Sequence, residues 1–186
     1  MTHYIDIRLR PDPDFSLDTL FEALFAKLHR ALVRHGLGDV GVSFPGYDGD
    51  RRLGVQLRLH GVAKSLDALM GQIWLEGMRD HVVDGPLTPV PAAVKHRIVR
   101  RVQAKSSPER LRRRQMRRHG LSEQQALEKV PACARESLSL PYVLLISKST
   151  GHAFPLFVQH GPLLAEPQSG RFSSYGLSDT ATVPWF

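Results

Sequence analysis

The 186-residue sequence predicts an α+β protein with two domains. Three observations lead to this prediction. Apolar residues alternate with period two in several short runs, they recur at helical spacing in two longer runs, and prolines cluster between positions 86 and 91. Hydrophobic residues make up 42% of the chain and charged residues 23%, so we expect a folded protein with a buried core rather than a disordered chain.

The first two elements are a strand and a long helix. Apolar positions alternate between His3 and Leu9, and two prolines directly afterwards end the strand. Ser16 is a suitable N-cap for the helix that follows, and Gly36 is a suitable C-cap. The helix has one broad apolar face, which consists of Leu17, Leu20, Phe21, Leu24, Phe25, Leu28, Ala31 and Leu32. His29 falls at the edge of this face.

A hairpin and a second helix come next. Apolar residues alternate in the runs 40–44 and 53–59, with turn-forming residues between them. Ser65 is expected to cap a helix whose apolar residues extend to Met78, and Val82 and Val83 to open a short strand. The order is therefore β-α-β-β-α-β. This is the order of a ferredoxin-like domain, in which two helices cover one face of a four-stranded antiparallel sheet.

The proline cluster at 86–91 is the expected boundary, which gives a ferredoxin-like domain of residues 1–90 and a smaller α+β domain of residues 91–186. In the second domain we expect a strand at 98–102 and an arginine-rich helix at 107–119, capped by Ser107. Ser122 and Gln125 form a capping-box pattern for another short helix, which Pro131 interrupts or ends. Further strands are expected at 142–147, 154–159 and 171–175.

Positive charge is concentrated in one segment. Residues 95–119 hold eleven of the 25 Lys and Arg side chains but only one of the 18 acids. Five arginines of the expected helix share one side, namely Arg110, Arg113, Arg114, Arg117 and Arg118. Like charges at this spacing repel, and phosphates would offset the repulsion, whereas a merely solvated helix face normally mixes signs. We therefore predict nucleic-acid binding, and a short RNA stem-loop suits the helix better than a long duplex.

The sequence offers no familiar metal or disulfide chemistry. It has one cysteine, Cys133, and nine histidines without CxxC or HExxH spacing, and it has no apolar run of membrane-spanning length. We expect a cytoplasmic protein without metal or cofactor, and no membrane association. RNA can be cut without a metal when a ribose 2′-OH attacks the adjacent phosphate, with histidine as the usual base. No single histidine is privileged by this reasoning, although His29 is a candidate, and Ser147, Ser149 and Tyr175 could supply hydroxyl groups.

Several segments carry a family resemblance that runs from end to end of the chain. They are IDIRLRPDPDF, FAKLHRAL around His29, RVQAKSSPERLRRRQMRRHGLS, SKSTGHAF, HGPL, YGLS and the terminal VPWF. Together they resemble the CRISPR repeat-processing endoribonuclease of the type I-F (Csy) system. The arginine segment and the terminal VPWF are the specific parts of the match.

The resemblance implies a metal-independent enzyme that binds the stem-loop of each repeat in CRISPR precursor RNA. It would cut at the 3′ base of the stem, leave a 2′,3′-cyclic phosphate and a 5′-OH, and stay bound to the product as a subunit of the type I-F surveillance complex. We expect a monomer on RNA alone. By resemblance, His29 is the catalytic histidine, Ser147 contacts the attacking 2′-OH and Tyr175 orients the site. The RNA-binding residues are then Arg101 and Gln103, which read bases beside the stem, Phe154, which stacks on the terminal base pair, Ser149, and the five helix arginines given above.

Two other functions fit parts of the sequence. The same basic helix and aromatic residue could hold an RNA hairpin in a structural subunit without catalysis, with His29 incidental. Alternatively, the arginine helix could enter the major groove of B-form DNA in a regulator, which would predict a dimer and a palindromic site.

Overall fold

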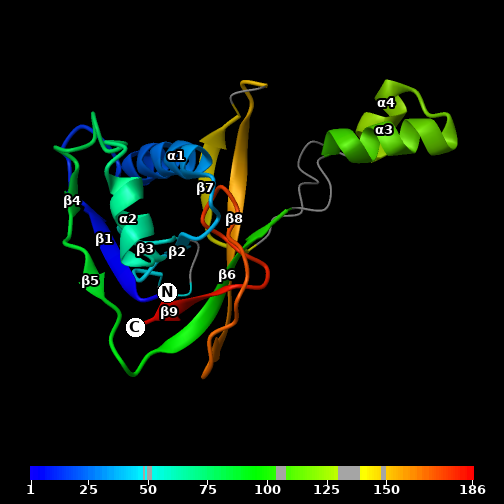
Figure 1. Ribbon diagram of the computed structural model, residues 1–186. Helices are drawn as coiled ribbons and strands as arrows, with labels where there is room; N and C mark the ends of the chain where they lie inside the picture. The colour runs from blue at the N-terminus through cyan, green and yellow to red at the C-terminus, as the bar shows by residue number, and fades with distance from the viewer. Residues whose placement is uncertain (48, 50–51, 104–107, 130–138, 148–149) are drawn as a thin grey trace. The chain divides into compact units, whose positions relative to one another are not determined.

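The computed structural model describes residues 1–47, 49, 52–103, 108–129, 139–147 and 150–186, with the backbone alone at 108–111. The chain forms two compact units, which are coloured by residue number in Figure 1. The first unit contains Met1–Arg101 and Leu140–Phe186, and the second contains Val102–Ser139. The sheets and the helices together make the protein α+β.

The first sheet is built from strands that precede residue 90. Its members are β1 (His3–Leu9), β2 (Gly41–Ser43), β3 (Gln56–Gly61), β4 (Val82–Asp84) and β5 (Thr88–Pro89). The strand order is β2-β3-β1-β4, and β5 also pairs with β1. All of these pairings are antiparallel, with Ile5 opposite Leu59 in the β1–β3 register. Two helices pack against β1, namely α1 (Leu17–His35) and α2 (Ala63–Met70).

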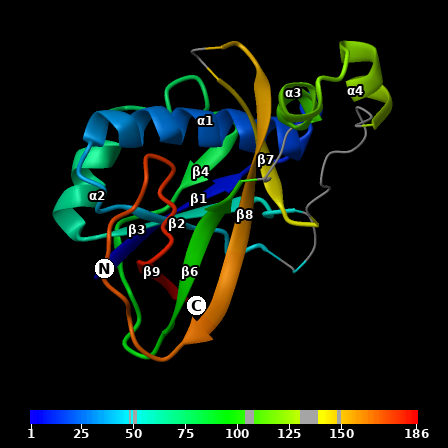
Figure 2. The same cartoon turned by 90° about the vertical axis from the view of Figure 1, so that its right-hand side faces the viewer.

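The second sheet is built from strands that follow residue 90. Its members are β6 (Lys95–Val102), β7 (Tyr142–Ile146), β8 (Ala153–Leu164) and β9 (Thr182–Trp185), in the order β7-β8-β6-β9. Figure 2 shows β6 and β8 side by side as long strands. Buried residues from both sheets belong to one hydrophobic cluster, for example Ile7 and Leu59 from the first sheet and Leu156 and Val183 from the second. The two sheets therefore share a core.

Arg58 joins the first sheet to the end of the chain. Its guanidinium donates hydrogen bonds to both carboxylate oxygens of Asp6, at 2.6 and 2.9 Å, and to the main-chain oxygen of Phe186 at 2.9 Å. The same group lies over the rings of Tyr4 and Phe186, 4.6 and 4.1 Å from their centroids. An arginine that is 8% exposed thus has its charge paired and its faces covered, as a buried cation requires.

The predicted ends of the first helix are confirmed. The Thr19 main-chain N–H donates to Ser16 Oγ at 3.1 Å, which satisfies one of the free donors at the start of α1. Gly36 has a left-handed φ of 71° and its N–H donates to the Leu32 carbonyl, so it ends the helix. The buried face of α1 consists of seven residues from the predicted set, while Leu17 is exposed.

The prediction for the second helix was wrong at both ends. α2 begins at Ala63 with Val62 as its N-cap, and the Ser65 hydroxyl donates to the Asp39 carboxylate at 2.5 Å instead of capping. The helix ends at Met70; Gly71 still has a right-handed helical φ of −62° with its N–H donating to the Asp67 carbonyl, and the chain turns after it. Ile73, one of the apolar residues that the prediction included in this helix before Met78, is 61% exposed with a φ of 53°.

A strand expected at 171–175 is also absent, and this segment is irregular with a turn at its end, at Ser174 and Tyr175. The Ser178 hydroxyl donates to the Arg171 carbonyl, and the Gly176 N–H donates to the Ser173 carbonyl. These local hydrogen bonds replace the ladder bonds of a strand, since serine side chains and glycine favour turns.

The second unit consists of α3 (Pro108–His119) and α4 (Glu123–Lys129). The capping box predicted at α4 is confirmed: Ser122 N–H donates to Gln125 Oε1 at 3.0 Å, and Gln125 N–H donates to Ser122 Oγ at 3.3 Å. The predicted cap Ser107 and the predicted helix end at Pro131 lie outside the described residues. None of the described helices is long and apolar enough to cross a membrane.

Candidate active site

A cavity of about 640 Å³ lies in the first unit, beside α1 and the β7–β8 hairpin. Four residues that were predicted for catalysis or RNA binding line this cavity together. The cavity is lined by Ala26, His29, Arg30, Val33, Arg34, Leu145, Ile146, Ser147, Phe154 and Tyr175. The fold therefore brings His29, Ser147, Phe154 and Tyr175 to one place, although up to 146 positions separate them in the sequence.

Helix α1 contributes one stripe of side chains to the cavity. Residues 26, 29, 30, 33 and 34 follow the three- and four-residue spacing that places side chains on one side of a helix. This stripe borders the buried face, because Ala26, His29 and Arg30 are partly buried while Val33 is exposed. The packing of α1 in the core therefore fixes the direction in which His29 leaves the helix.

A turn at Ser173–Leu177 holds the imidazole of His29. The Ser174 carbonyl lies 2.8 Å from His29 Nδ1, and the Tyr175 ring stacks on the imidazole with centroids 4.1 Å apart and planes 9° apart. Both partners come from consecutive residues of the same turn. His29 is thus held at its edge by a hydrogen-bond acceptor and on one face by an aromatic ring.

Arg101, at the end of β6, lies over two aromatic rings of the site. Its guanidinium carbon is 5.3 Å from the centroid of Tyr175 and 5.7 Å from that of Phe154. Both distances are within the range of cation–π attraction. One cation therefore contacts the ring that stacks on His29 and the ring predicted to stack on RNA.

The β7–β8 hairpin places Ser147 and Phe154. Val143 and Leu145 of β7 are buried, whereas the alternate residues Tyr142, Leu144 and Ile146 are exposed. Phe154 of β8 pairs with Leu145, so both side chains lie on the same face of the sheet and both line the cavity.

The turn of this hairpin begins at Ser147. The Ser147 N–H donates to the His152 carbonyl at 3.0 Å, and the Ser147 carbonyl accepts from the Gly151 N–H at 2.8 Å. Ser149, a predicted RNA-binding residue in this turn, lies outside the described residues.

Glu22 of α1 makes a hydrogen bond to the β7–β8 hairpin. Burial raises the pKa of Glu22, and a hydrogen bond from the Leu144 main chain acts in the opposite direction without cancelling it. This carboxylate therefore contacts a main-chain donor of β7, which is an edge strand of the second sheet.

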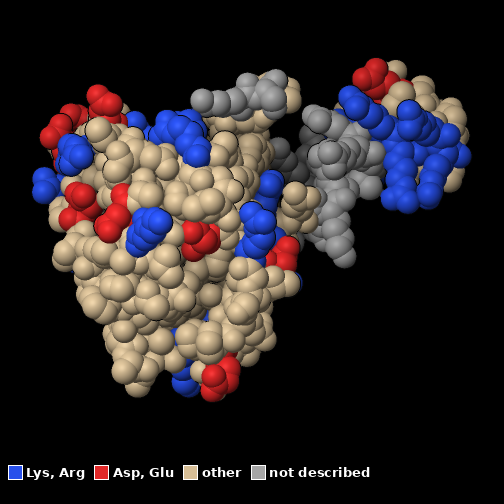
Figure 3. Space-filling view, in the orientation of Figure 1, with Lys and Arg blue, Asp and Glu red and all other residues tan. Residues whose placement is uncertain are grey.

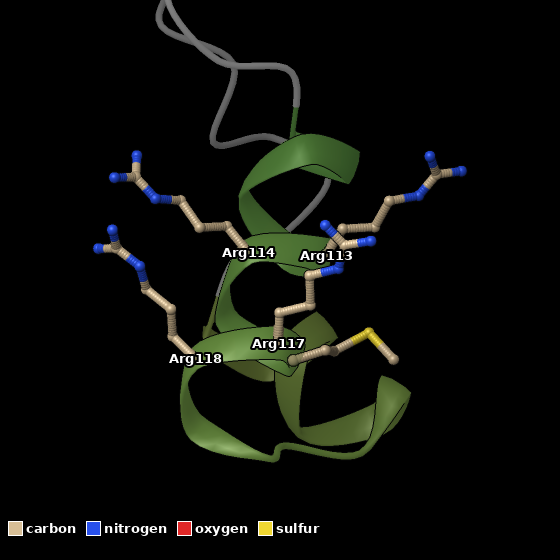
Figure 4. A pocket seen from close by; sticks show the side chains of 5 residues that line it. Arg113, Arg114, Arg117 and Arg118 are labelled. Carbon is tan, nitrogen blue, oxygen red and sulfur yellow. The ribbon is translucent and has the colours of Figure 1, made fainter.

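The second unit carries the helix arginines predicted to bind nucleic acid. Space-filling atoms in Figure 3 show Lys and Arg over much of its visible face. Arg113, Arg114, Arg117 and Arg118 line a hollow on α3 together with Met116. Figure 4 shows Arg114 and Arg118 extending next to each other on one side of the helix, while Arg113 extends from the other. The four exposed side chains thus form one broad cationic surface on α3.

Two further predicted RNA-binding residues belong to the second unit or its edge. Gln103 is exposed, directly after β6. Arg110 lies within α3, and its side chain is outside the described part of the structure. Across the described residues, no group of three or more His, Cys, Asp or Glu side chains is arranged to hold a metal ion.

Comparison with known proteins identifies the family. The sequence profile of the CRISPR-associated protein family Cas_Csy4 matches residues 4–186, nearly the whole chain. The chain belongs to this family. A Cas6/Csy4 protein of Pseudomonas aeruginosa (strain UCBPP-PA14), named a CRISPR-associated endonuclease, is 53% identical over 187 residues, and the alignment covers 100% of both chains. A protein of the same name from Escherichia coli (strain UTI89 / UPEC) is 50% identical over 186 residues, again with full coverage of both chains.

Reasoning from the sequence missed part of this Csy4-family cavity. Arg30, Val33 and Arg34 were not predicted, although their spacing from His29 on α1 was available as a signal. Ile146 also lines the cavity, and its position directly before Ser147 could have indicated this. The Ser174 carbonyl had no comparable signal, because a main-chain acceptor leaves no trace in residue type.

Proposed function

We propose that this protein is a metal-independent endoribonuclease that binds the stem-loop of CRISPR repeats in precursor RNA and cuts at the 3′ base of the stem. The observation that carries the proposal is the held imidazole of His29 in one cavity with Ser147, Phe154 and Tyr175. Membership in a family of CRISPR-associated endonucleases supports the same reaction.

The proposed step is an internal transfer at phosphorus. The 2′-oxygen of the nucleotide before the cut forms a bond to the adjacent phosphorus, and the bond from phosphorus to the 5′-oxygen of the next nucleotide breaks. The 2′-OH loses a proton and the departing oxygen gains one, so the products are a 2′,3′-cyclic phosphate and a 5′-OH. His29 is the group that exchanges protons with the reacting oxygens, and Ser147 hydrogen-bonds to the attacking 2′-OH.

Positioning supplies much of the catalysis in this proposal. The 2′-OH must lie in line with the breaking bond, and holding it there removes a large part of the barrier. Phe154 stacks on the terminal base pair of the stem, and Arg101 reads a base beside it, as does Gln103. The arginines of α3, with Arg114, Arg117 and Arg118 foremost, hold the major groove of the stem near its end, where it is accessible to side chains.

Two parts of the wider proposal concern architecture and partners. The strand order β2-β3-β1-β4 with two helices against β1 supports a ferredoxin-like domain over residues 1–90, followed by the RNA-binding α+β domain of 91–186. We propose that the protein acts in the cytoplasm, binds its RNA as a monomer, and keeps the cleaved stem-loop as a subunit of the type I-F surveillance complex.

The test uses the repeat RNA of the protein's own genome in excess EDTA. One RNA is all ribose, and the other carries a single 2′-deoxy nucleotide before the cut. We expect one cut in the all-ribose RNA, none in the deoxy RNA, and nearly equal binding of both. Cleavage of the deoxy RNA would refute the 2′-OH mechanism, and loss of all cleavage in EDTA would refute metal independence.

A His29→Ala variant separates the enzyme from a purely structural subunit. The proposal predicts that this variant binds the stem-loop and leaves it intact. If the wild type also binds tightly and cuts neither RNA, the protein is a hairpin-binding subunit without catalysis. If duplex DNA displaces the hairpin RNA, the arginine helix serves a DNA-binding protein instead.

A further inference from the structure

The hydrogen bond between His29 and Ser174 restricts which ring nitrogen carries a proton. A main-chain carbonyl can only accept a hydrogen bond, so the nitrogen 2.8 Å from it must be the donor. That nitrogen is Nδ1. In a neutral imidazole the other nitrogen, Nε2, is then the unprotonated one and can accept a proton.

Stacking keeps the imidazole from rotating about its Cβ–Cγ bond. Tyr175 covers one face of the imidazole, with centroids 4.1 Å apart and planes 9° apart. Rotation about the Cβ–Cγ bond would lose the stacking, and a half-turn would place Cδ2 in the position from which Nδ1 donates to the Ser174 carbonyl. The two contacts therefore select one orientation as well as one protonated nitrogen.

The turn that provides both contacts is tied together and tied to the first sheet. Ser173 N–H donates to the Leu177 carbonyl and Gly176 N–H to the Ser173 carbonyl, both at 2.8 Å. Tyr175 N–H lies 3.3 Å from Ser173 Oγ. The Gly176 carbonyl in turn accepts from the N–H of Val42, a fully buried residue of β2, at 2.8 Å.

Gly176 is the position where this turn tolerates no side chain. Its φ of 70° lies in the left-handed region, which favours glycine. A Cβ there would also collide with the side chain of Val42, and Val42 is packed in the core and cannot withdraw. Any larger residue would push the turn off the sheet and carry the Ser174 carbonyl and the Tyr175 ring with it.

We infer that the turn Ser173–Leu177 fixes His29 in the form protonated on Nδ1, so that Nε2 exchanges the proton with the RNA, and that Gly176 is a positioning residue for this reaction. The inference deepens the proposed function and rests on it for the role of Nε2. Ser174 acts through its main chain, which is why its own side chain need not be of any particular type. Gly176 acts through the turn and contacts neither the RNA nor the reacting atoms.

The first measurement reads the protonated nitrogen directly. Protein labelled with ¹⁵N-histidine is studied by NMR at alkaline pH, where a free imidazole is neutral, and the His29 signals are assigned by their loss in His29→Gln. We expect the shifts of a protonated Nδ1 and an unprotonated Nε2. A protonated Nε2 in the wild type would overturn the inference, whether or not the protein cleaves RNA.

The second measurement compares Gly176→Ala with Gly77→Ala. Gly77 is a matched control, because its φ of 71° imposes the same backbone cost on alanine, while the nearest atom to a Cβ, Lys27 Nζ, is 3.9 Å away. For Gly176→Ala we expect cleavage of bound RNA to slow by about tenfold or more, and the His29 signals to show both protonated forms. RNA affinity should stay within about twofold of the wild type for both variants.

The outcomes distinguish this inference from the proposed function. Gly176→Ala with wild-type cleavage and an unchanged His29 spectrum would refute a positioning role. A wild type that cuts no repeat RNA would refute the proposed function, and the NMR measurement would still test which nitrogen of His29 is protonated. If Gly176→Ala does not fold, Ser173→Ala removes only the side-chain acceptor of the Tyr175 N–H, and the same two readouts apply, with a smaller loss of rate expected.

Discussion

Acidification should destabilise the fold through His60, a buried histidine of β3. The imidazole is fully buried, and its Nε2 lies 2.8 Å from Ser43 Oγ. Burial, and secondarily the charges of Arg58 and the N-terminal amino group, lower the pKa of His60 from 6.5 to about 3. Below pH 6.5 His60 is therefore protonated in the unfolded chain but stays neutral in the native protein, so stability is lost as the pH falls toward about 3.

The size of this effect follows from proton linkage. Each pH unit between the two pKa values lowers the free energy of unfolding by about 1.4 kcal/mol, so a fall from pH 6.5 to about 4.5 costs roughly 2 to 3 kcal/mol. His160 acts in the same direction, because burial and then the charge of Arg97 lower its pKa to about 4, but the shift is smaller than that of His60 and the residue as a whole is only partly buried, so its contribution is smaller.

Urea unfolding from pH 8 to about 4.5 measures the effect. Carboxylates titrate in every variant, so the informative quantity is the difference between the wild type and a His60→Leu/Ser43→Ala double variant, which removes both members of the buried pair. This difference should shift by roughly 2 to 3 kcal/mol in favour of the double variant as the pH falls. His152→Ala, at an exposed histidine, is the control and should show no such shift. A difference that is independent of pH would refute the reasoning.

Two other predictions concern stability. Arg58→Met should lower the free energy of unfolding by about 2 to 4 kcal/mol, because it leaves the Asp6 carboxylate without its partner in a half-buried site. Urea unfolding measures this loss. A loss no larger than that of the Asp6→Ala/Arg58→Met double variant would contradict the prediction. Ser122→Ala should destabilise the start of α4 by about 1 kcal/mol, since the Gln125 N–H loses its acceptor. Faster amide exchange confined to α4 would support this, and unchanged exchange at Gln125 would count against it.

The elements that could be predicted from sequence are those whose signals are local. The periodicity of α1 and its caps at Ser16 and Gly36 depend only on neighbouring residues, and the structure has them as expected. The same holds for the capping box at α4 and for the strand expected at 142–147, which the structure has as β7. In each case the side chains that satisfy the backbone or form the buried face lie within a few positions of one another.

The elements that were predicted wrongly depend on distant residues. Ser65 has the residue type of an N-cap, but its hydroxyl is taken by Asp39, which lies 26 positions away and also accepts from His35. Burial acts to raise the pKa of Asp39, but these two hydrogen bonds outweigh it, so the pKa lies below its ordinary value and the carboxylate stays charged. Local propensity cannot show such a competition, because the deciding acceptor comes from another element.

The contacts within the candidate site also depend on residues that are distant in the sequence, and the sequence does not show them. The resemblance indicated His29, Ser147, Phe154 and Tyr175 as separate residues, but their order in the sequence does not show that one turn supplies both contacts to the imidazole. The contacts depend on the main-chain carbonyl of Ser174 and on the backbone conformation of Gly176, and neither can be inferred from the type of side chain.

The site also depends on both sides of the predicted boundary at residue 90. His29 comes from α1, which precedes the boundary, while every contact to its ring described above comes from residues after it. The turn that makes these contacts is itself hydrogen-bonded to Val42 of β2. Residues after the boundary therefore position His29, and a residue before it positions the turn. Residues 1–90 alone would present His29 without an acceptor, and residues 91–186 alone would lack the strand that shapes the turn. In the proposed mechanism, catalysis therefore depends on the packing of the two sheets on their shared core, and we expect a core substitution far from the RNA to slow cleavage by displacing one sheet against the other.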